Sequence, residues 1–197
     1  MHPYLNRLGV PLSVQHFFEP YFTTDVANHL LFAYGDAHEH YGQGLHCPPL
    51  TAAVPWTAGT DGGLITQVFV CSSAMEAIAY LTLYHARYPD LNALYFCALG
   101  ASLPVALKLP KAKATLLFEN SLSGKLWDIR IACLIRRKPV RILYDNQQFI
   151  FHCQNRSFSL AMDKVSLSAF EQAAGIRTGI RTAKAKGYST FFEQLTR

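Results

Sequence analysis

The sequence predicts an α/β fold in which helices cover both faces of a parallel sheet. Between residues 66 and 144, short apolar runs typical of buried strands alternate with segments that have helical apolar spacing. Half of the 197 residues are hydrophobic and 16% are charged, which provides enough apolar surface for a packed core. A small irregular α+β region is expected before this fold, because residues 28–64 contain short apolar pieces separated by glycine and proline.

The elements follow in order. One short helix is expected near residues 12–19, between Pro11 and Pro20. The expected strands of the parallel sheet are 67–71, 93–98, 113–118 and 140–144. Ser72 and Ser73 are expected to cap a helix that ends before Pro89, and a second helix is expected over 124–137. A hairpin at the sheet edge (148–154 and 156–161) and a helix over 166–175 complete the pattern.

This order predicts three segments. Residues 1–64 form a small N-terminal α+β region packed on the core, and residues 65–161 form the α/β domain. Residues 162–197 form a helical, basic C-terminal extension. The chain length suits one compact domain or one domain with a small annex.

Charge is divided unevenly along the chain. Residues 1–102 contain two basic residues and seven acids, whereas residues 103–197 contain sixteen basic residues and six acids. The C-terminal half therefore has the composition of a surface that faces a polyanion such as DNA or RNA. The alternative is a solvated basic face without a partner.

The five cysteines are odd in number and show no CxxC spacing. Four of them, Cys71, Cys97, Cys133 and Cys153, fall in apolar segments and are expected to be buried free thiols in a reducing compartment. No apolar run is long enough to cross a bilayer, and the first residues lack a signal-peptide core, so a cytoplasmic location without membrane contact is expected.

The most informative stretch is residues 114–128, where a buried-type strand runs into Glu119-Asn120-Ser121 and then into a helix. Open α/β sheets place their chemistry at the carboxyl ends of such strands. An acid cluster here would indicate Mg²⁺ and phosphate chemistry. This corner has one acid and two neutral polar residues.

Residues 66–144 carry motifs that resemble a known family. A strand leads into Ser72-Ser73-Ala74-Met75-Glu76-Ala77-Ile78-Ala79, the next strand is followed by Leu99-Gly100, and the third by Glu119-Asn120-Ser121 and Ser123-Gly124-Lys125. This order is similar to the Toprim (topoisomerase-primase) domain, above all to primase-like proteins of plasmids and bacterial mobile elements. The flanks 4–10 and 187–195 resemble the openings and closing tails of those proteins more loosely.

The resemblance implies a Rossmann-like parallel sheet and, in active relatives, Mg²⁺-dependent nucleotidyl transfer. It places the family's catalytic glutamate on Ser72 and its metal-binding acids on Glu119 and Ser121. Serine is a poor Mg²⁺ ligand, and its hydroxyl cannot replace a carboxylate as a general acid or base at neutral pH. The substitutions therefore argue against the family's chemistry in this chain.

Two carboxylates remain as catalytic candidates, Glu119 and Glu76, and Glu119 is also the one weak candidate for a metal ligand. For both, a structural role is favoured: a helix N-terminal charge or, for Glu76, also the partner of a buried polar group. Asp145 could add a third carboxylate, although a turn role is favoured. His38, His40, His46 and Cys47 form the densest set of possible metal ligands, but they complete no recognised zinc pattern. Magnesium is the cofactor if the chain is active; none is otherwise expected.

Ten cationic residues are candidates for contact with nucleic-acid phosphates. The first group surrounds the predicted second helix and fourth strand, and the second group has spacings that could share a helix face. They are Lys125, Arg130, Arg136, Arg137, Lys138 and Arg141, followed by Arg177, Arg181, Lys184 and Lys186.

The sequence thus favours a Toprim-like protein without catalytic activity that binds DNA or RNA, as an accessory to replication, primase or mobilisation proteins. One alternative is an active Mg²⁺-dependent primase or nuclease that uses Glu76 and Glu119 in a rearranged site. Another is a non-enzymatic scaffold whose basic face binds an acidic protein.

Overall fold

The computed structural model describes residues 1–50, 52, 54–59, 64–104 and 106–197. Its centre is a mixed sheet with the strand order β12-β8-β6-β7-β5. In this sheet β6 (Gln67–Cys71), β7 (Leu94–Ala98), β8 (Lys113–Leu116) and β12 (Arg181–Thr182) are parallel, and β5 (Trp56–Ala58) runs antiparallel to β7. The prediction of an α/β protein with a sheet that contains parallel strands is therefore confirmed.

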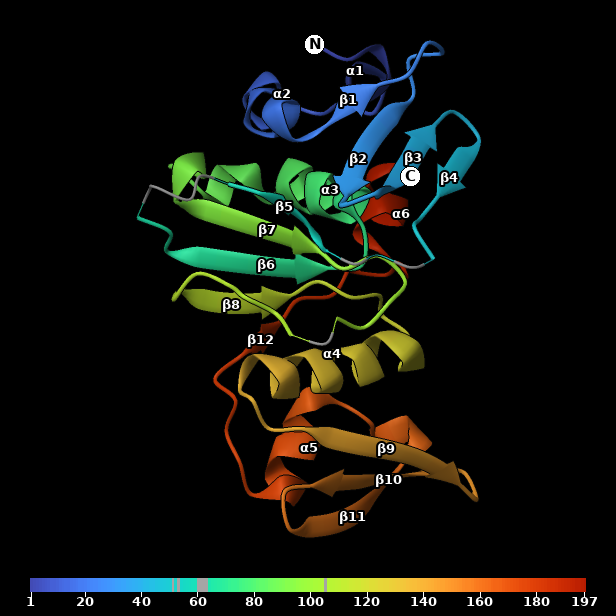
Figure 1. The fold of residues 1–197 in the computed structure, drawn as a ribbon, viewed down its shortest axis with the longest axis vertical. Helices are drawn as coiled ribbons and strands as arrows, with labels where there is room; N and C mark the ends of the chain where they lie inside the picture. Colours follow the sequence, from blue (N-terminus) through green and yellow to red (C-terminus); the bar gives the residue numbers. More distant parts are fainter. Residues whose placement is uncertain (51, 53, 60–63, 105) are drawn as a thin grey trace.

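Alternation along β6 explains why both faces of the sheet are covered. Phe69 and Cys71 point into one apolar core, together with α3 (Ala74–Tyr84), and Val68 and Val70 point into the other, with α4 (Leu122–Ile135). Side chains of a strand alternate between faces, so a continuous apolar run requires cover on both sides. Figure 1 shows α3 and α4 on opposite faces of the sheet.

The N-terminal region, predicted as a small irregular α+β region, forms its own antiparallel sheet. Its strands are β1 (Thr23–Thr24), β2 (Leu30–Tyr34), β3 (Ala37–Gly42) and β4 (Leu45–Cys47), in that order. Helices α1 (Pro3–Arg7) and α2 (Leu12–Phe18), followed by the 3₁₀ turn η1 (Glu19–Tyr21), precede them. The side chains of this region join the core on the α3 side of the central sheet.

The fourth predicted strand lies in a different sheet, so that part of the prediction is wrong. Residues 140–145 form β9 (Val140–Asp145), which pairs with β10 (Gln148–Cys153) and then β11 (Arg156–Ala161) in an antiparallel sheet. Arg141 interrupts the apolar run of β9, and four of the six residues of this strand are exposed. A strand within a parallel sheet would be buried on both faces.

The place beside β8 is taken by β12, a two-residue strand from much later in the chain. Residues 136–180 therefore form an excursion from the central sheet: β9–β11, the 3₁₀ turn η4 (Met162–Lys164) and α5 (Leu167–Ala174). Figure 1 shows this excursion packed beyond α4, after which the chain returns to the sheet.

Arg177, Arg181, Lys184 and Lys186 do not share a helix face, which corrects a second prediction. Helix α5 ends at Ala174, and Gly175 follows with a left-handed φ of 66°. Such a residue closes a helix, and glycine adopts it without strain. The last helix, α6 (Phe191–Leu195), lies against α3 near the N-terminal sheet.

Lys184 ties this returning segment to α4. Its ammonium group lies 2.7 Å from the Asp128 carboxylate and donates to the backbone oxygens of Phe118 (3.0 Å) and Glu119 (3.2 Å). Asp128 is 2% exposed, and burial raises its pKa from the usual 3.8 to about 6, although Lys184 opposes the shift. Ionisation of the Asp128 carboxyl group therefore lowers the free energy of unfolding.

Four of the five cysteines are buried and Cys47 is exposed; all five lie among the described residues and are free thiols. This confirms that the four cysteines in apolar segments are buried and free. Within the part of the chain that the structure describes, no helix combines the length and apolar character that a bilayer span needs.

We predict that stability falls as pH rises through the titration of Asp128. Between pH 4 and 6 the folded state binds a proton that the unfolded state has released, so the free energy of unfolding decreases, by up to about 3 kcal/mol for a shift of about two units. Urea unfolding at pH 4 and pH 7 should show a smaller decrease in Asp128→Asn than in the original chain. In Asp145→Asn, where the replaced acid is exposed, the decrease should persist. An unchanged decrease in Asp128→Asn would contradict the assignment.

Candidate functional site

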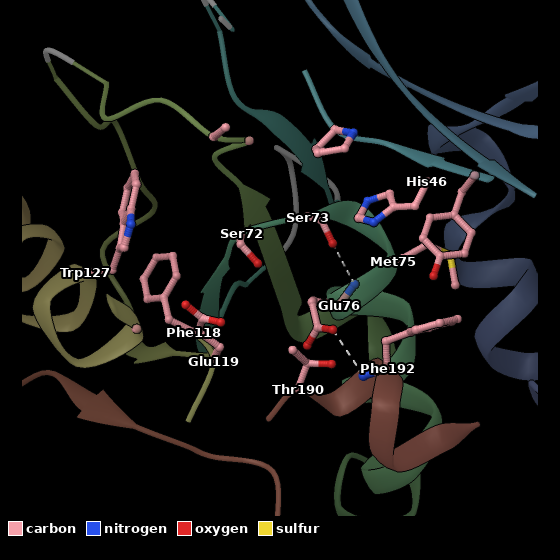
Figure 2. Close-up of a pocket in the computed structure, with 15 residues that line it drawn as sticks. His46, Ser72, Ser73, Met75, Glu76, Phe118, Glu119, Trp127, Thr190 and Phe192 are labelled. Atoms are coloured by element: carbon pink, nitrogen blue, oxygen red, sulfur yellow. Dashed lines mark hydrogen bonds between the residues drawn. The ribbon is translucent and has the colours of Figure 1, made fainter. Parts of the chain in front are cut away.

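A cavity of about 460 Å³ opens where the central strands end. Ser72 follows β6, Gly100 follows β7 and Glu119 follows β8, and all three line it. Because these strands are parallel and β6 lies between the other two, their carboxyl ends meet at a topological switch point, the usual ligand site of open α/β sheets. Figure 2 shows Phe118 and Trp127 on one side of this strand-end cavity, and His46 and Phe192 on the other.

The start of α4 explains the shape of the corner at Glu119. Ser121 is the N-cap residue, and its hydroxyl accepts a hydrogen bond from the Gly124 N–H at 3.1 Å. A Cβ atom on Gly124 would lie 2.0 Å from the Glu119 backbone oxygen, so only glycine allows this approach. Ser121 is therefore used as a cap, which is the ordinary role of serine at such a position.

Glu119 is the one cavity acid with an uncommitted side chain. It is partly buried, and among the described residues its carboxylate has no hydrogen-bond or ion-pair partner. The N-terminus of α4 stabilises a negative charge nearby. The carboxylate is thus available to a ligand in the cavity.

Glu76 also lines the cavity, but its carboxylate is occupied. It accepts hydrogen bonds from the N–H groups of Phe191 (2.9 Å) and Phe192 (3.1 Å) at the start of α6. The residue is 7% exposed, and burial raises its pKa while these backbone bonds oppose the shift. Glu76 thus holds the last helix in place and closes the cavity wall at Phe192. The sequence favoured a structural role of this kind but did not identify α6 as the partner.

A third acid, Glu39, lies directly behind the cavity. It is fully buried, accepts hydrogen bonds from the Tyr34 hydroxyl (2.7 Å) and the Ala74 N–H (2.9 Å), and lies 3.3 Å from the His46 ring. The sequence placed Glu39 only in a histidine-rich cluster. The signal for its role was strand alternation, because Glu39 points to the opposite face of β3 from its neighbours His38 and His40.

The same alternation divides the candidate metal ligands. His40 pairs with Cys47 in the β3–β4 ladder, and Tyr41 pairs with His46, so His46 lies on the other face from His38, His40 and Cys47. Across the described residues, no group of three histidine, cysteine or acidic side chains is placed to hold a metal ion. Asp145 ends β9 in the separate sheet and does not line the cavity.

Two of the predicted phosphate contacts occupy the far end of α4. Arg136 and Arg137, which follow the helix, line a hollow of about 870 Å³ at the amino ends of the central strands. Three lysines that sequence reasoning missed, Lys108, Lys111 and Lys113, line it as well. All five cations are exposed, and no acid is found among the lining residues described. We call this the basic hollow.

The other cationic candidates are dispersed. Lys125 and Arg130 lie on α4, Lys138 follows it, and Arg141 lies on β9. Arg181 lies on β12; Arg177 precedes that strand and Lys186 follows Lys184. Lys184 is held by Asp128 and two backbone oxygens. The basic hollow could not be recognised from sequence spacing, because the lysines and arginines that form it are separated by more than twenty residues.

Comparison with known proteins adds no relative: no family model, no curated protein and no solved structure matches the chain.

We predict that Glu76→Gln destabilises the protein by about 1–3 kcal/mol, because the amide NH₂ opposes one of the two α6 N–H donors. Chemical denaturation should show the loss, and amide exchange at Phe191 and Phe192 should accelerate. The control is Glu19→Gln, which changes an exposed acid in η1 and should leave both unchanged. Unchanged stability in Glu76→Gln would refute the capping role.

Proposed function

We propose that the chain is a Toprim-like protein without the metal chemistry of that family, and that it binds nucleic acid through the basic hollow. It would serve as an accessory to replication, primase or mobile-element functions. The observation that carries the binding part is the set of five exposed cations in one acid-free concavity. Lysine and arginine side chains neutralise phosphates without reading sequence, so DNA and RNA are both suitable ligands.

The Toprim part is supported by where the motif residues lie. Ser72 and Glu119 follow adjacent parallel strands at one edge of the sheet, and Ser121 caps the helix after the second. The resemblance assigns the family's acids to these three positions. A Rossmann-like Toprim sheet is therefore a reasonable description of the central strands, although β12 comes from the end of the chain.

The residues at the corner do not fit a Mg²⁺ site of that family. Ser121 is a neutral cap, Ser72 has no carboxylate, and Glu76 is bonded to two N–H groups of α6. That leaves Glu119 as a single carboxylate, the minimum with which proteins hold Mg²⁺ beside substrate phosphates, and no further free acid among the described lining residues for the proton transfer that the family requires.

Binding to a labelled thymidine oligomer, measured by fluorescence anisotropy, tests the proposal. If the five cations contact three to five phosphates, the logarithm of the affinity should fall with the logarithm of salt concentration with a slope of about −2 to −3.5. Lys111→Gln should weaken binding roughly three- to tenfold and reduce the magnitude of the slope by about 0.7. Binding that is absent or independent of salt would remove the nucleic-acid part.

Two controls accompany this measurement. Lys164→Gln removes an exposed cation on η4, away from the basic hollow, and should bind like the original chain. Millimolar Mg²⁺ should leave the melting temperature unchanged. A Mg²⁺-dependent rise that disappears in Glu119→Gln would contradict the proposed loss of metal chemistry.

Arg137 provides a sharper test, because its backbone has a left-handed φ of 53°. This conformation is strained for arginine and relaxed for glycine, and the position directly after a helix commonly holds glycine. We predict that Arg137→Gly changes two properties in opposite directions. Stability should rise by about 0.5–1 kcal/mol, while affinity for the oligomer falls.

Arg137→Ala serves as the matched variant for this pair. It should lose affinity to the same extent without the gain in stability, because alanine keeps the strain. Equal affinity of Arg137→Gly and the original chain would show that this side chain does not contact the ligand.

A further inference from the structure

The strand-end cavity has two aromatic walls that the nucleic-acid proposal does not use. Phe118 and Trp127 are stacked, with ring centroids 5.6 Å apart at 28°. On the opposite side, Tyr41 and Phe192 make an edge contact at 5.0 Å. Figure 2 shows Phe118 and Phe192 on opposite sides of the cavity, with Glu119 beside Phe118. Flat aromatic walls are suited to a planar ring, and the volume is in the usual range for small-ligand sites.

The charge within this cavity excludes phosphate as the main ligand group. The Glu119 carboxylate faces the cavity without a partner among the described residues. The nearby ammonium group of Lys184 is neutralised by Asp128. His46 lies against the buried Glu39, and Glu76 adds a second acid to the lining. The cavity thus offers a free acceptor to a neutral or cationic ligand that carries hydrogen-bond donors.

We propose that the strand-end cavity binds a guanine-type base between its aromatic walls, with the Glu119 carboxylate accepting from two adjacent N–H groups. A carboxylate has two acceptor oxygens side by side and forms its strongest bonds with paired donors. Guanine has such a pair in its ring N–H and neighbouring amino group. Adenine and cytosine place an amino donor beside a ring acceptor, and uracil places one N–H between two carbonyls, which a carboxylate repels.

The base has two possible sources, a free nucleoside or an unpaired nucleic-acid strand. The proposal does not depend on the basic hollow, since the two sites share none of their described lining residues. It therefore goes beyond the proposed function, and either can fail without the other.

Titration calorimetry with guanosine, adenosine and uridine tests the ligand class, and Trp127 gives a second signal. The chain has two tryptophans, and Trp56 is only 3% exposed, so a stacked base should quench mainly Trp127 fluorescence. Guanosine should bind at least tenfold more tightly than adenosine or uridine. Glu119→Gln should reduce guanosine affinity by about ten- to a hundredfold, as expected for lost charge-assisted hydrogen bonds.

The control variant is Glu19→Gln, which removes an exposed acid outside the cavity and should bind guanosine like the original chain. Thermal melting of Glu119→Gln establishes that the variant is folded, which is expected because the replaced carboxylate has no partner among the described residues.

Two oligomers distinguish the sources of the base: an unpaired thymidine oligomer and the same oligomer with one guanosine. A strand source predicts tighter binding of the second, and Glu119→Gln should remove only this increment, whereas Lys111→Gln should weaken both oligomers equally. Binding of guanosine alone supports a free nucleoside. The proposal is overturned if the three nucleosides bind equally or if Glu119→Gln leaves guanosine binding unchanged. It is also overturned if guanosine does not bind at millimolar concentration and the guanosine-containing oligomer binds no more tightly than the thymidine oligomer.

Discussion

The buried Glu76 carboxylate connects α3 to the last helix of the chain, α6, and the strand-end cavity depends on it. Two backbone N–H groups of α6, 115 and 116 residues further along, donate to its oxygens. This holds Phe192 against Tyr41 and so forms one wall of the cavity. A carboxylate bonded in this way repays its desolvation by satisfying two helix donors that would otherwise lack partners. The same bonds leave it poorly placed to accept a proton from a substrate.

Other charged groups near the strand-end cavity also have hydrogen-bond or ion-pair partners within the protein. Glu39 satisfies Tyr34 and the first turn of α3, and Asp128 neutralises Lys184, which itself holds the Glu119 backbone. Arg136 is also committed, because its Nε–H donates to the Thr178 backbone oxygen. Among the described lining residues, what remains without a partner is one acid at the carboxyl ends of the strands and four cations at the amino ends. Helix α4 runs between them over roughly 21 Å. Its dipole favours this distribution, since negative charge is stabilised at the helix start and positive charge at its end.

The sequence predicts those parts of the fold that depend on local pattern. The apolar runs of β6, β7 and β8 and the serine cap of α3 are where the sequence places them. The cap of α4 is not among the predictions, because Ser121 enters only as a position of the family motif and the helix is expected to start at residue 124. It fails where pairing is decided over long distances. β12 has only two residues and no pattern of its own, yet its pairing with β8 displaces β9 from the sheet. No local signal distinguishes a returning two-residue strand from a loop.

The residues of the candidate sites also fall into two groups, those located by local pattern and those placed by long-range packing. Glu119 could be located from its place after a strand, and Arg136 and Arg137 from the basic composition around α4. The contribution of Lys108, Lys111 and Lys113 follows from the path of the crossover between β7 and β8, which composition does not determine. The role of Glu76 depends on where the last helix docks, and a short helix of five residues has little preference of its own.

The number of free carboxylates at the corner decides what it can hold. Two or three would repel one another and recruit a divalent cation, whereas a single carboxylate flanked by aromatic faces is satisfied by a neutral ligand with N–H donors. Glu119 is flanked by Phe118 on its own strand end and faces Phe192 across the cavity. Aromatic walls exclude water and lower the local dielectric, which strengthens each hydrogen bond that the carboxylate accepts and raises the cost of leaving it unpaired. A single free carboxylate and aromatic walls therefore act together at this position, and both favour the proposed base over a metal ion.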